Sequence, residues 1–177
     1  INFNNHLDKI QFMNKKRLIV AFSGPSNSGK TTVIVKVSSI LHDNGFKVCI
    51  VKHDPKDKAM FDREGKDSFK FSQTGADVAV VSPNKTTLFK KNTSTIDEMI
   101  ELFQDFDYLL VEGLKTLELP RISIFRDRLD ESYFAVTDAI ACDETINKDE
   151  IPDNIDKLDL NNPEELIQWI DKNAKRV

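Results

Sequence analysis

One short segment constrains the fold of this chain more than any other. Residues 24–31 read GPSNSGKT and fit the spacing GxxxxGK[ST], in which a glycine-rich turn leads into a lysine and a hydroxyl residue. The apolar run LIVAF precedes the segment at residues 18–22, and apolar residues at helical spacing follow it over residues 30–43. A buried strand, a glycine-rich loop and an amphipathic helix in this order are typical of a phosphate-binding loop.

The same alternation continues along the chain. Residues 48–51 form a second apolar run, so strand, helix and strand make a βαβ unit with parallel strands and a right-handed crossover. We therefore predict an α/β fold of the P-loop NTPase type, a three-layer arrangement with helices on both faces of a mostly parallel sheet. The other predicted elements are a helix over 67–74, a hairpin of strands 78–81 and 86–89, a capped helix over 95–103, strands over 108–111, 121–125 and 134–137, and a last helix beginning at Asn162-Pro163.

Length and composition limit the class of protein. The 177 residues fit one domain, which we place at 15–177, and residues 1–14 are interpreted as a disordered or non-native extension because Met13 resembles a normal start. No apolar run approaches the roughly 20 residues of a membrane-spanning helix. Cys49 and Cys142 lie in neither metal-ligand nor CxxC spacing, which favours reduced cysteines and a cytoplasmic location.

Charge is distributed unevenly. Residues 1–91 carry 16 basic and 8 acidic side chains, and residues 92–177 carry 9 basic and 21 acidic ones, so a net charge of −4 combines halves of +8 and −12. A basic half suits a polyanionic partner such as a nucleotide, although a solvated face explains the charge equally well. No basic stretch is interleaved with aromatic residues, which makes nucleic acid an unlikely partner.

The loop residues have distinct predicted roles. Backbone amides from about Asn27 to Thr31 can surround a β-phosphate, and the following helix adds its positive end. Lys30 is predicted to bridge β- and γ-phosphate oxygens, and the Thr31 hydroxyl to ligate Mg²⁺. The predicted phosphate-binding residues are Gly24, Asn27, Ser28, Gly29, Lys30, Thr31 and Thr32, the last near the α-phosphate.

Acidic residues at strand ends supply further candidates. Glu112 and Gly113 end the apolar run 108–111, where an acid can hold Mg²⁺ and a glycine can sense the γ-phosphate, although many strands end in a surface acid. His53 and Asp54 follow the second strand at the same predicted edge, and Asp54 is a candidate second Mg²⁺ acid or water-positioning residue. We predict catalytic roles for Lys30, Glu112 and Asp54, and metal roles for Thr31, Glu112 and Asp54. Lys66 and Asp67 begin a helix that can bind an anion or can be an ordinary capped helix.

Several segments together resemble one family. AFSGPSNSGKTT, IVKHD, GKDSFKFSQTGAD, LLVEGLK and PRISIFR followed by AVTD occur in the order found in the molybdopterin-guanine dinucleotide biosynthesis protein B (MobB) family, over about residues 17–170. The resemblance implies a GTP-binding adapter with feeble GTP hydrolysis, dependent on Mg²⁺ and acting in molybdenum cofactor synthesis. It also implies a homodimer that accompanies the guanylyltransferase MobA, with molybdopterin-bearing proteins as further candidate partners. It assigns phosphate roles to the loop residues, metal-side roles to Glu112 and Asp54, and places Lys66 and Asp67 in the family's GKDS element.

The base-reading residue is not evident, because the chain has no NKxD motif. A carboxylate suits guanine, whose N1–H and N2–H are donors, and Asp138 after the predicted strand 134–137 is our candidate, with a simple turn residue as the alternative. Hydrolysis is predicted to be slow, because no arginine is obviously placed as an arginine finger. Arg63, Arg121 and Arg126 are the only plausible donors in cis. The alternative function is a P-loop small-molecule kinase using ATP or GTP, which transfer of labelled phosphate to an acceptor would reveal.

Overall fold

The computed structural model describes residues 15–177, which form two compact units. The first contains the described residues up to His53 together with Phe103–Val177, and the second contains Asp54–Leu102. Among the described residues, none of the helices is both long and apolar enough to cross a lipid bilayer. The predicted extension at 1–14 lies outside the described residues.

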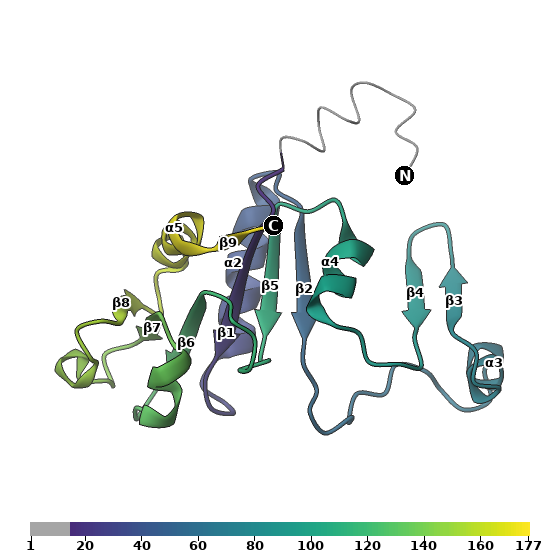
Figure 1. Cartoon of the computed structure of the whole chain (residues 1–177), viewed down its shortest axis with the longest axis horizontal. Coiled ribbons are helices and arrows are strands. Elements are labelled where there is room, and N and C mark those ends of the chain that lie inside the picture. Colours follow the sequence, from purple (N-terminus) through teal and green to yellow (C-terminus); the bar gives the residue numbers. More distant parts are fainter. Residues whose placement is uncertain (1–14) are drawn as a thin grey trace. The chain divides into compact units, whose positions relative to one another are not determined.

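The first unit is built on a seven-stranded sheet in the order β2-β5-β1-β6-β7-β8, with β9 pairing antiparallel to β1 (Figure 1). All other pairs are parallel. The strands are β1 (Leu18–Ser23), β2 (Val48–Lys52), β5 (Tyr108–Glu112), β6 (Arg121–Phe125), β7 (Ala139–Cys142), β8 (Asp156–Asp159) and β9 (Lys175–Arg176). The prediction of a mostly parallel sheet with helices is confirmed.

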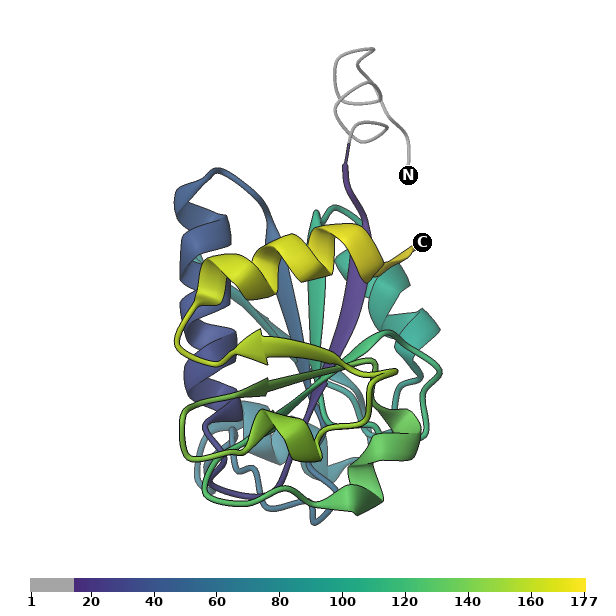
Figure 2. The same ribbon diagram turned by 90° about the vertical axis from the view of Figure 1, so that its left-hand side faces the viewer.

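Two α-helices of this unit, α2 (Lys30–Asp43) and α5 (Pro163–Asn173), cover one face of the sheet (Figure 2). Val20 and Phe22 of β1 pack there against apolar residues of both helices, such as Val37 and Ile170. On the opposite face, Phe125 and Ile140 belong to a second apolar cluster. Two 3-10 helices, η1 (Glu131–Val136) and η2 (Lys148–Glu150), occur in the connections around that cluster.

Several predicted elements differ from the structure in this unit. Residues 134–137 were predicted as a strand, but they belong mostly to η1. The strand is β7, which starts at Ala139, five residues after the predicted start. The apolar pattern was misassigned because Phe134 packs as a 3-10 residue against the second cluster. β2 is an edge strand, and Cys49 on it is only half-buried.

The second unit is smaller and has little interior. It contains α3 (Asp67–Gln73), the antiparallel pair β3 (Val78–Val81) and β4 (Thr86–Phe89), and α4 (Ile96–Phe103), whose last residue falls in the first unit. The predicted hairpin and capping box are confirmed: Thr95 N–H donates to Glu98 Oε2, and Glu98 N–H donates to Thr95 Oγ1. Val78 is the buried apolar residue that this unit contributes.

Candidate functional site

The phosphate loop joins β1 to α2 at the carboxyl edge of the sheet. Its backbone requires glycine at two positions, because Gly24 has φ +135° and Gly29 has φ +94°. A Cβ on Gly24 would lie 2.3 Å from the carbonyl oxygen of Ile124, so the loop rests directly on β6. The amide of Val33 donates to the Gly29 carbonyl at 3.0 Å and starts the hydrogen-bond ladder of α2. The Ser28 amide donates to the Pro25 carbonyl at 3.4 Å, whereas the amides from Gly29 to Thr32 donate to no backbone carbonyl within the described residues and are left for a ligand.

Two side chains of the loop are suited to bind an anion. Lys30 is half-buried and its Nζ donates to the carbonyls of Gly24 at 3.0 Å and Pro25 at 2.6 Å, so the ammonium lies across the loop. Burial is the main cause that lowers the pKa of Lys30, and Glu112 opposes it. The Ser28 hydroxyl is buried and has no hydrogen-bond partner in the described part of the chain. A buried hydroxyl without a partner is costly, and a bound phosphate oxygen would satisfy it.

Glu112 lies beside this loop. A depression of about 470 Å³ is lined by Ser26, Asn27, Gly29, Lys30, Thr31, Thr32 and Glu112. Parallel register aligns Phe22, Lys52 and Glu112 on three neighbouring strands, and Lys52 Nζ lies 3.0 Å from Glu112 Oε2. The predicted juxtaposition of Glu112 with Lys30 and Thr31 is therefore present. A hydroxyl and a carboxylate at the loop fit the ligand preference of Mg²⁺, which is usually held by few protein oxygens and by phosphates.

Gly113 and His53 adjoin the same edge. The Gly113 amide donates to the Phe22 carbonyl at 2.9 Å, and the His53 amide donates to the Glu112 carbonyl at 3.0 Å. A Cβ on Gly113 would lie 3.1 Å from the His53 Cβ. Gly113 therefore allows close packing of the two strand ends, and its role in sensing the γ-phosphate stays a prediction.

Asp54, Lys66 and Asp67 belong to the second unit. The carboxylate of Asp54 accepts hydrogen bonds from the amides of Lys56, Lys58 and Ala59, and these bonds lower its pKa, that of Ala59 most. Asp67 is the first residue of α3 and pairs with Lys70 at 3.2 Å. The contacts of Asp54 and Asp67 therefore hold local structure, and a ligand role for them, or for Lys66, stays a prediction.

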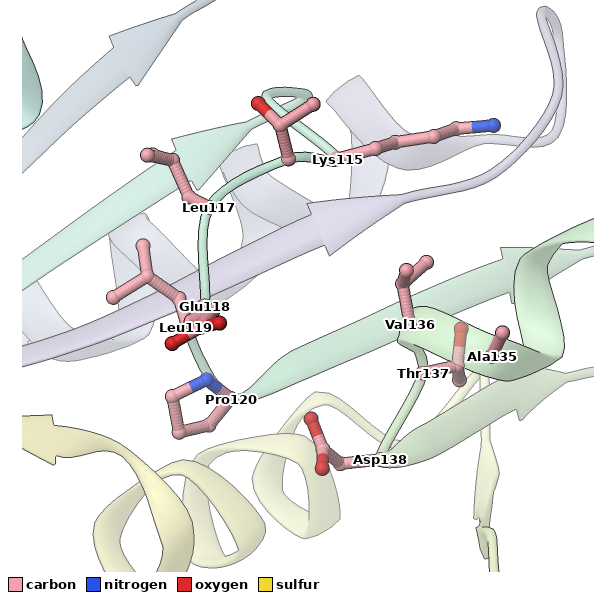
Figure 3. Close-up of a pocket in the computed structure, with 10 residues that line it drawn as sticks. Lys115, Leu117, Glu118, Leu119, Pro120, Ala135, Val136, Thr137 and Asp138 are labelled. Atoms are coloured by element: carbon pink, nitrogen blue, oxygen red, sulfur yellow. The ribbon is translucent and has the colours of Figure 1, made fainter.

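Asp138 lies at the wrong end of its strand for the role we predicted. It precedes β7 instead of following a strand, and its Oδ2 accepts a hydrogen bond from the Arg121 amide at 2.8 Å. It lines a separate depression of about 790 Å³ beside Pro120, where β6 and β7 begin (Figure 3). Asp107 likewise precedes its strand, β5, and its carboxylate accepts hydrogen bonds from the amides of Lys16 and Lys47.

The three candidate arginines have different surroundings. Arg121 is fully buried, and its guanidinium donates to Ser23 Oγ and to the carbonyls of Gly113, Leu114 and Leu117. That prediction of a cis donor is wrong, because the side chain holds the interior together. Arg63 is part of the second unit. Arg126 follows β6 beside the loop and is paired with Asp143. Asp143 was not among the predicted site residues, because the predicted strand 134–137 ends well before the true end of β7.

Several curated proteins are similar to this chain in sequence. A curated molybdopterin-guanine dinucleotide biosynthesis adapter protein of Escherichia coli is 30% identical over 173 residues, which cover 87% of this chain and 94% of the relative. One of Haemophilus influenzae is 26% identical over 170 residues, covering 92% and 93%. Against a relative from Methanocaldococcus jannaschii, 28% identical over 116 residues, the alignment covers 62% of this chain and 48% of the relative.

Solved structures show the same fold. The crystal structure of Bacillus subtilis MobB aligns with a TM-score of 0.71 at 25% identity, covering 86% of this chain and 97% of that one. A structure of molybdopterin-guanine biosynthesis protein B aligns with a TM-score of 0.68 at 26% identity, with the same coverage. Residues 19–143 match the family described as molybdopterin guanine dinucleotide synthesis protein B, so this chain belongs to the MobB family.

Proposed function

We propose that this protein is a GTP-binding adapter in the synthesis of molybdopterin guanine dinucleotide. The observation that carries the nucleotide part is the phosphate loop, with its two left-handed glycines, the Lys30 ammonium across it and the unpartnered Ser28 hydroxyl. The adapter part is supported by the names of the relatives that match most of the chain. The base preference follows from the guanine in the product that those names state.

Mg²⁺ would be held between nucleotide and protein. Thr31 supplies a hydroxyl and Glu112 a carboxylate, and the remaining ligands would be phosphate oxygens and water. Lys52 competes for Glu112, so its ammonium would shift when the metal enters. Hydrolysis is expected to be slow, because the guanidinium of Arg121 is committed to four interior acceptors.

Nucleotide binding is tested by isothermal titration of GTP in Mg²⁺ against the wild type, Lys30→Ala and Lys36→Ala. Lys36 is an exposed residue of α2, the helix that begins at Lys30, and its substitution controls for the loss of one positive charge. We expect Lys30→Ala to lose tight binding with unchanged circular dichroism, and Lys36→Ala to bind as the wild type does. Equal GTP affinity of Lys30→Ala and Lys36→Ala would overturn the assignment of the loop. A separate incubation with labelled nucleotide tests the alternative function, because transfer of labelled phosphate to an acceptor would indicate a kinase and not an adapter.

A homodimer is part of the proposal, and the second unit supports it. The β3–β4 pair bonds to no other strand within the described residues, and two-stranded sheets are marginally stable alone. Several large apolar side chains of this unit are exposed: Phe71, Val80, Val81 and Leu88. Sedimentation should show a dimer that Val81→Asp dissociates. Val35→Asp, at an exposed apolar position of α2, should leave the dimer intact.

The proposed partner is the guanylyltransferase MobA, and the proposed location is the cytoplasm, where molybdopterin-bearing proteins would be met. Both follow from the family. Co-sedimentation of the purified proteins with and without GTP tests the partner. Binding that occurs in neither condition would contradict the adapter role and leave nucleotide binding untouched.

A further inference from the structure

Two charged residues lie together at the edge of the sheet that carries the phosphate loop. Phe125 and Cys142 are register partners at the carboxyl ends of β6 and β7, and Arg126 and Asp143 follow them by one residue each. Arg126 Nε lies 3.3 Å from Asp143 Oδ2. A ligand at the carboxyl edge of a parallel sheet meets residues in this position.

Arg126 also lies against the phosphate loop itself. A Cβ placed on Gly29 would be 3.7 Å from Arg126 Nε and 3.8 Å from its Cζ. The side chain of Arg126 is 45% exposed and that of Asp143 is 12% exposed, so the guanidinium has solvent beside it whereas the carboxylate is enclosed by protein. The pair thus borders the loop on the side of β6, whereas Glu112 and Lys52 border it on the side of β5 and β2.

This arrangement determines which end of a bound nucleotide would lie beside which strands. The γ-phosphate and Mg²⁺ belong on the side of Glu112, since Thr31 and Lys30 line one depression with it. The nucleoside end must then leave the loop on the other side, toward β6 and β7. Asp138, the residue predicted from sequence, is five residues before Asp143 and therefore roughly 16 Å away along an extended strand.

The Asp143 carboxylate is oriented for recognition. Its Oδ1 accepts hydrogen bonds from the Thr145 amide at 3.2 Å and from the Thr145 hydroxyl, and these two bonds restrain the carboxylate. Its Oδ2 meets Arg126 across a long ion pair, which a competing donor can replace. An ionised carboxylate has about four acceptor positions, enough for two further donors.

We infer that Asp143 reads the guanine base, accepting hydrogen bonds from its N1–H and 2-amino group, and that Arg126 leaves Asp143 to lie against the face of the base. When the base replaces Arg126 at Asp143, the carboxylate gains the two donors of the base. The guanidinium is weakly hydrated and stacks well on an aromatic plane, so it gains the face of the base as its new contact. The inference rests on the proposed function, because it assumes that the loop holds the nucleotide phosphates.

The first test uses the wild-type protein, so a folding defect caused by a substitution cannot affect the result. Binding of GDP, IDP and XDP is measured by isothermal titration in Mg²⁺. IDP lacks the 2-amino group and XDP places a carbonyl oxygen there, facing the carboxylate. We expect GDP to bind at least about tenfold more tightly than IDP, and IDP more tightly than XDP. Equal affinities for the three diphosphates would overturn the inference.

The second test exchanges the acceptor for a donor. Asp143→Asn presents an amide that matches xanthine, so the preference should invert from GDP to XDP. Glu144→Gln removes the neighbouring exposed carboxylate as a matched control and should keep the wild-type order. Arg126→Ala should weaken the binding of GDP and of IDP by similar factors, about tenfold, and should leave the ratio of the two affinities unchanged. An unchanged GDP-to-XDP ratio in Asp143→Asn would refute the role of Asp143.

Inorganic tripolyphosphate separates this inference from the proposed function. It occupies the loop without a base, so Asp143→Asn should bind it while its base preference changes. If the wild type binds tripolyphosphate and GDP but does not discriminate between bases, the base reader is wrong and the phosphate site stands. If the wild type binds neither probe, the proposed function fails first and the inference fails with it.

Discussion

The guanidinium of Arg121 lies 2.8 Å from the hydroxyl of Ser23, the residue that immediately precedes the phosphate loop. The same guanidinium donates to the Gly113 carbonyl at 2.9 Å, one residue beyond Glu112. A single buried side chain therefore ties the start of the loop to the strand end that carries the candidate metal ligand. It positions both without touching a ligand itself.

Removing this side chain should destabilise the protein strongly. Arg121→Ala leaves Ser23 Oγ and three carbonyl oxygens without their donor in the interior. We expect the free energy of unfolding to fall by about 3–5 kcal/mol. Arg121→Lys should recover only part of it, because an ammonium cannot reproduce the planar fork. Urea denaturation measures the effect, with Arg128→Ala at an exposed position as the control. A loss below about 1 kcal/mol would show that the guanidinium is replaceable by water.

The two glycines Gly24 and Gly45 form a matched pair for testing the loop. Both have positive φ, +135° and +83°, so alanine is strained at each. Only at Gly24 does the new Cβ meet backbone, the Ile124 carbonyl at 2.3 Å, whereas at Gly45 nothing lies within 4 Å. Gly45→Ala should cost about 1 kcal/mol of unfolding free energy, and Gly24→Ala roughly 3 kcal/mol. Thermal denaturation of both variants gives the difference, and equal costs would mean that the loop moves away from β6 freely.

The strands and helices of the first half of the chain and the phosphate loop could be predicted because each depends on local signals, whereas β8 and β9 were not predicted. The apolar runs of β1 and β5 and the helical period of α2 are continuous, and Lys30 and Thr31 occupy fixed positions in a spacing that has one structural meaning. The capping box of Thr95 and Glu98 is equally local. These features need no information about distant residues.

The errors concern features that depend on distant contacts. Residues 134–137 are apolar enough for a strand, but Phe134 packs in a 3-10 turn, and only the β7 pairing with β6 shows where the strand begins. That shift of a few residues put Asp138 at the expected ligand edge and hid Asp143. The interior role of Arg121 was equally invisible, since its acceptors are carbonyls whose positions depend on the fold.

The hydroxyl of Tyr108 gives a prediction about pH. It donates to Asp171 Oδ1 at 2.6 Å, and burial followed by this hydrogen bond raises the pKa of Tyr108 to about 12. The folded protein keeps the proton that the unfolded chain loses near pH 10, so this contribution to stability is complete below pH 10 and is lost as the pH rises toward 12. The difference in the free energy of unfolding between wild type and Tyr108→Phe, measured by urea titration, should therefore be smaller at pH 11 than at pH 8. A gap of equal size at both pH values would contradict the shift.

Glu112 provides the sharpest test of the metal assignment. Its carboxylate lies by the loop and pairs with Lys52 at 3.0 Å, so Mg²⁺ must displace an ammonium that is itself well exposed. Glu112→Gln removes the charge but keeps the shape, and we expect the Mg²⁺ concentration that half-saturates the gain in GTP affinity to rise about tenfold. Lys52→Met should shift it the other way, because the competitor is gone. Glu118→Gln, an exposed acid further along the chain, should leave the titration unchanged. If all three variants titrate like the wild type, Glu112 is a strand-end acid held by Lys52, and the metal is bound by the nucleotide and Thr31 without it.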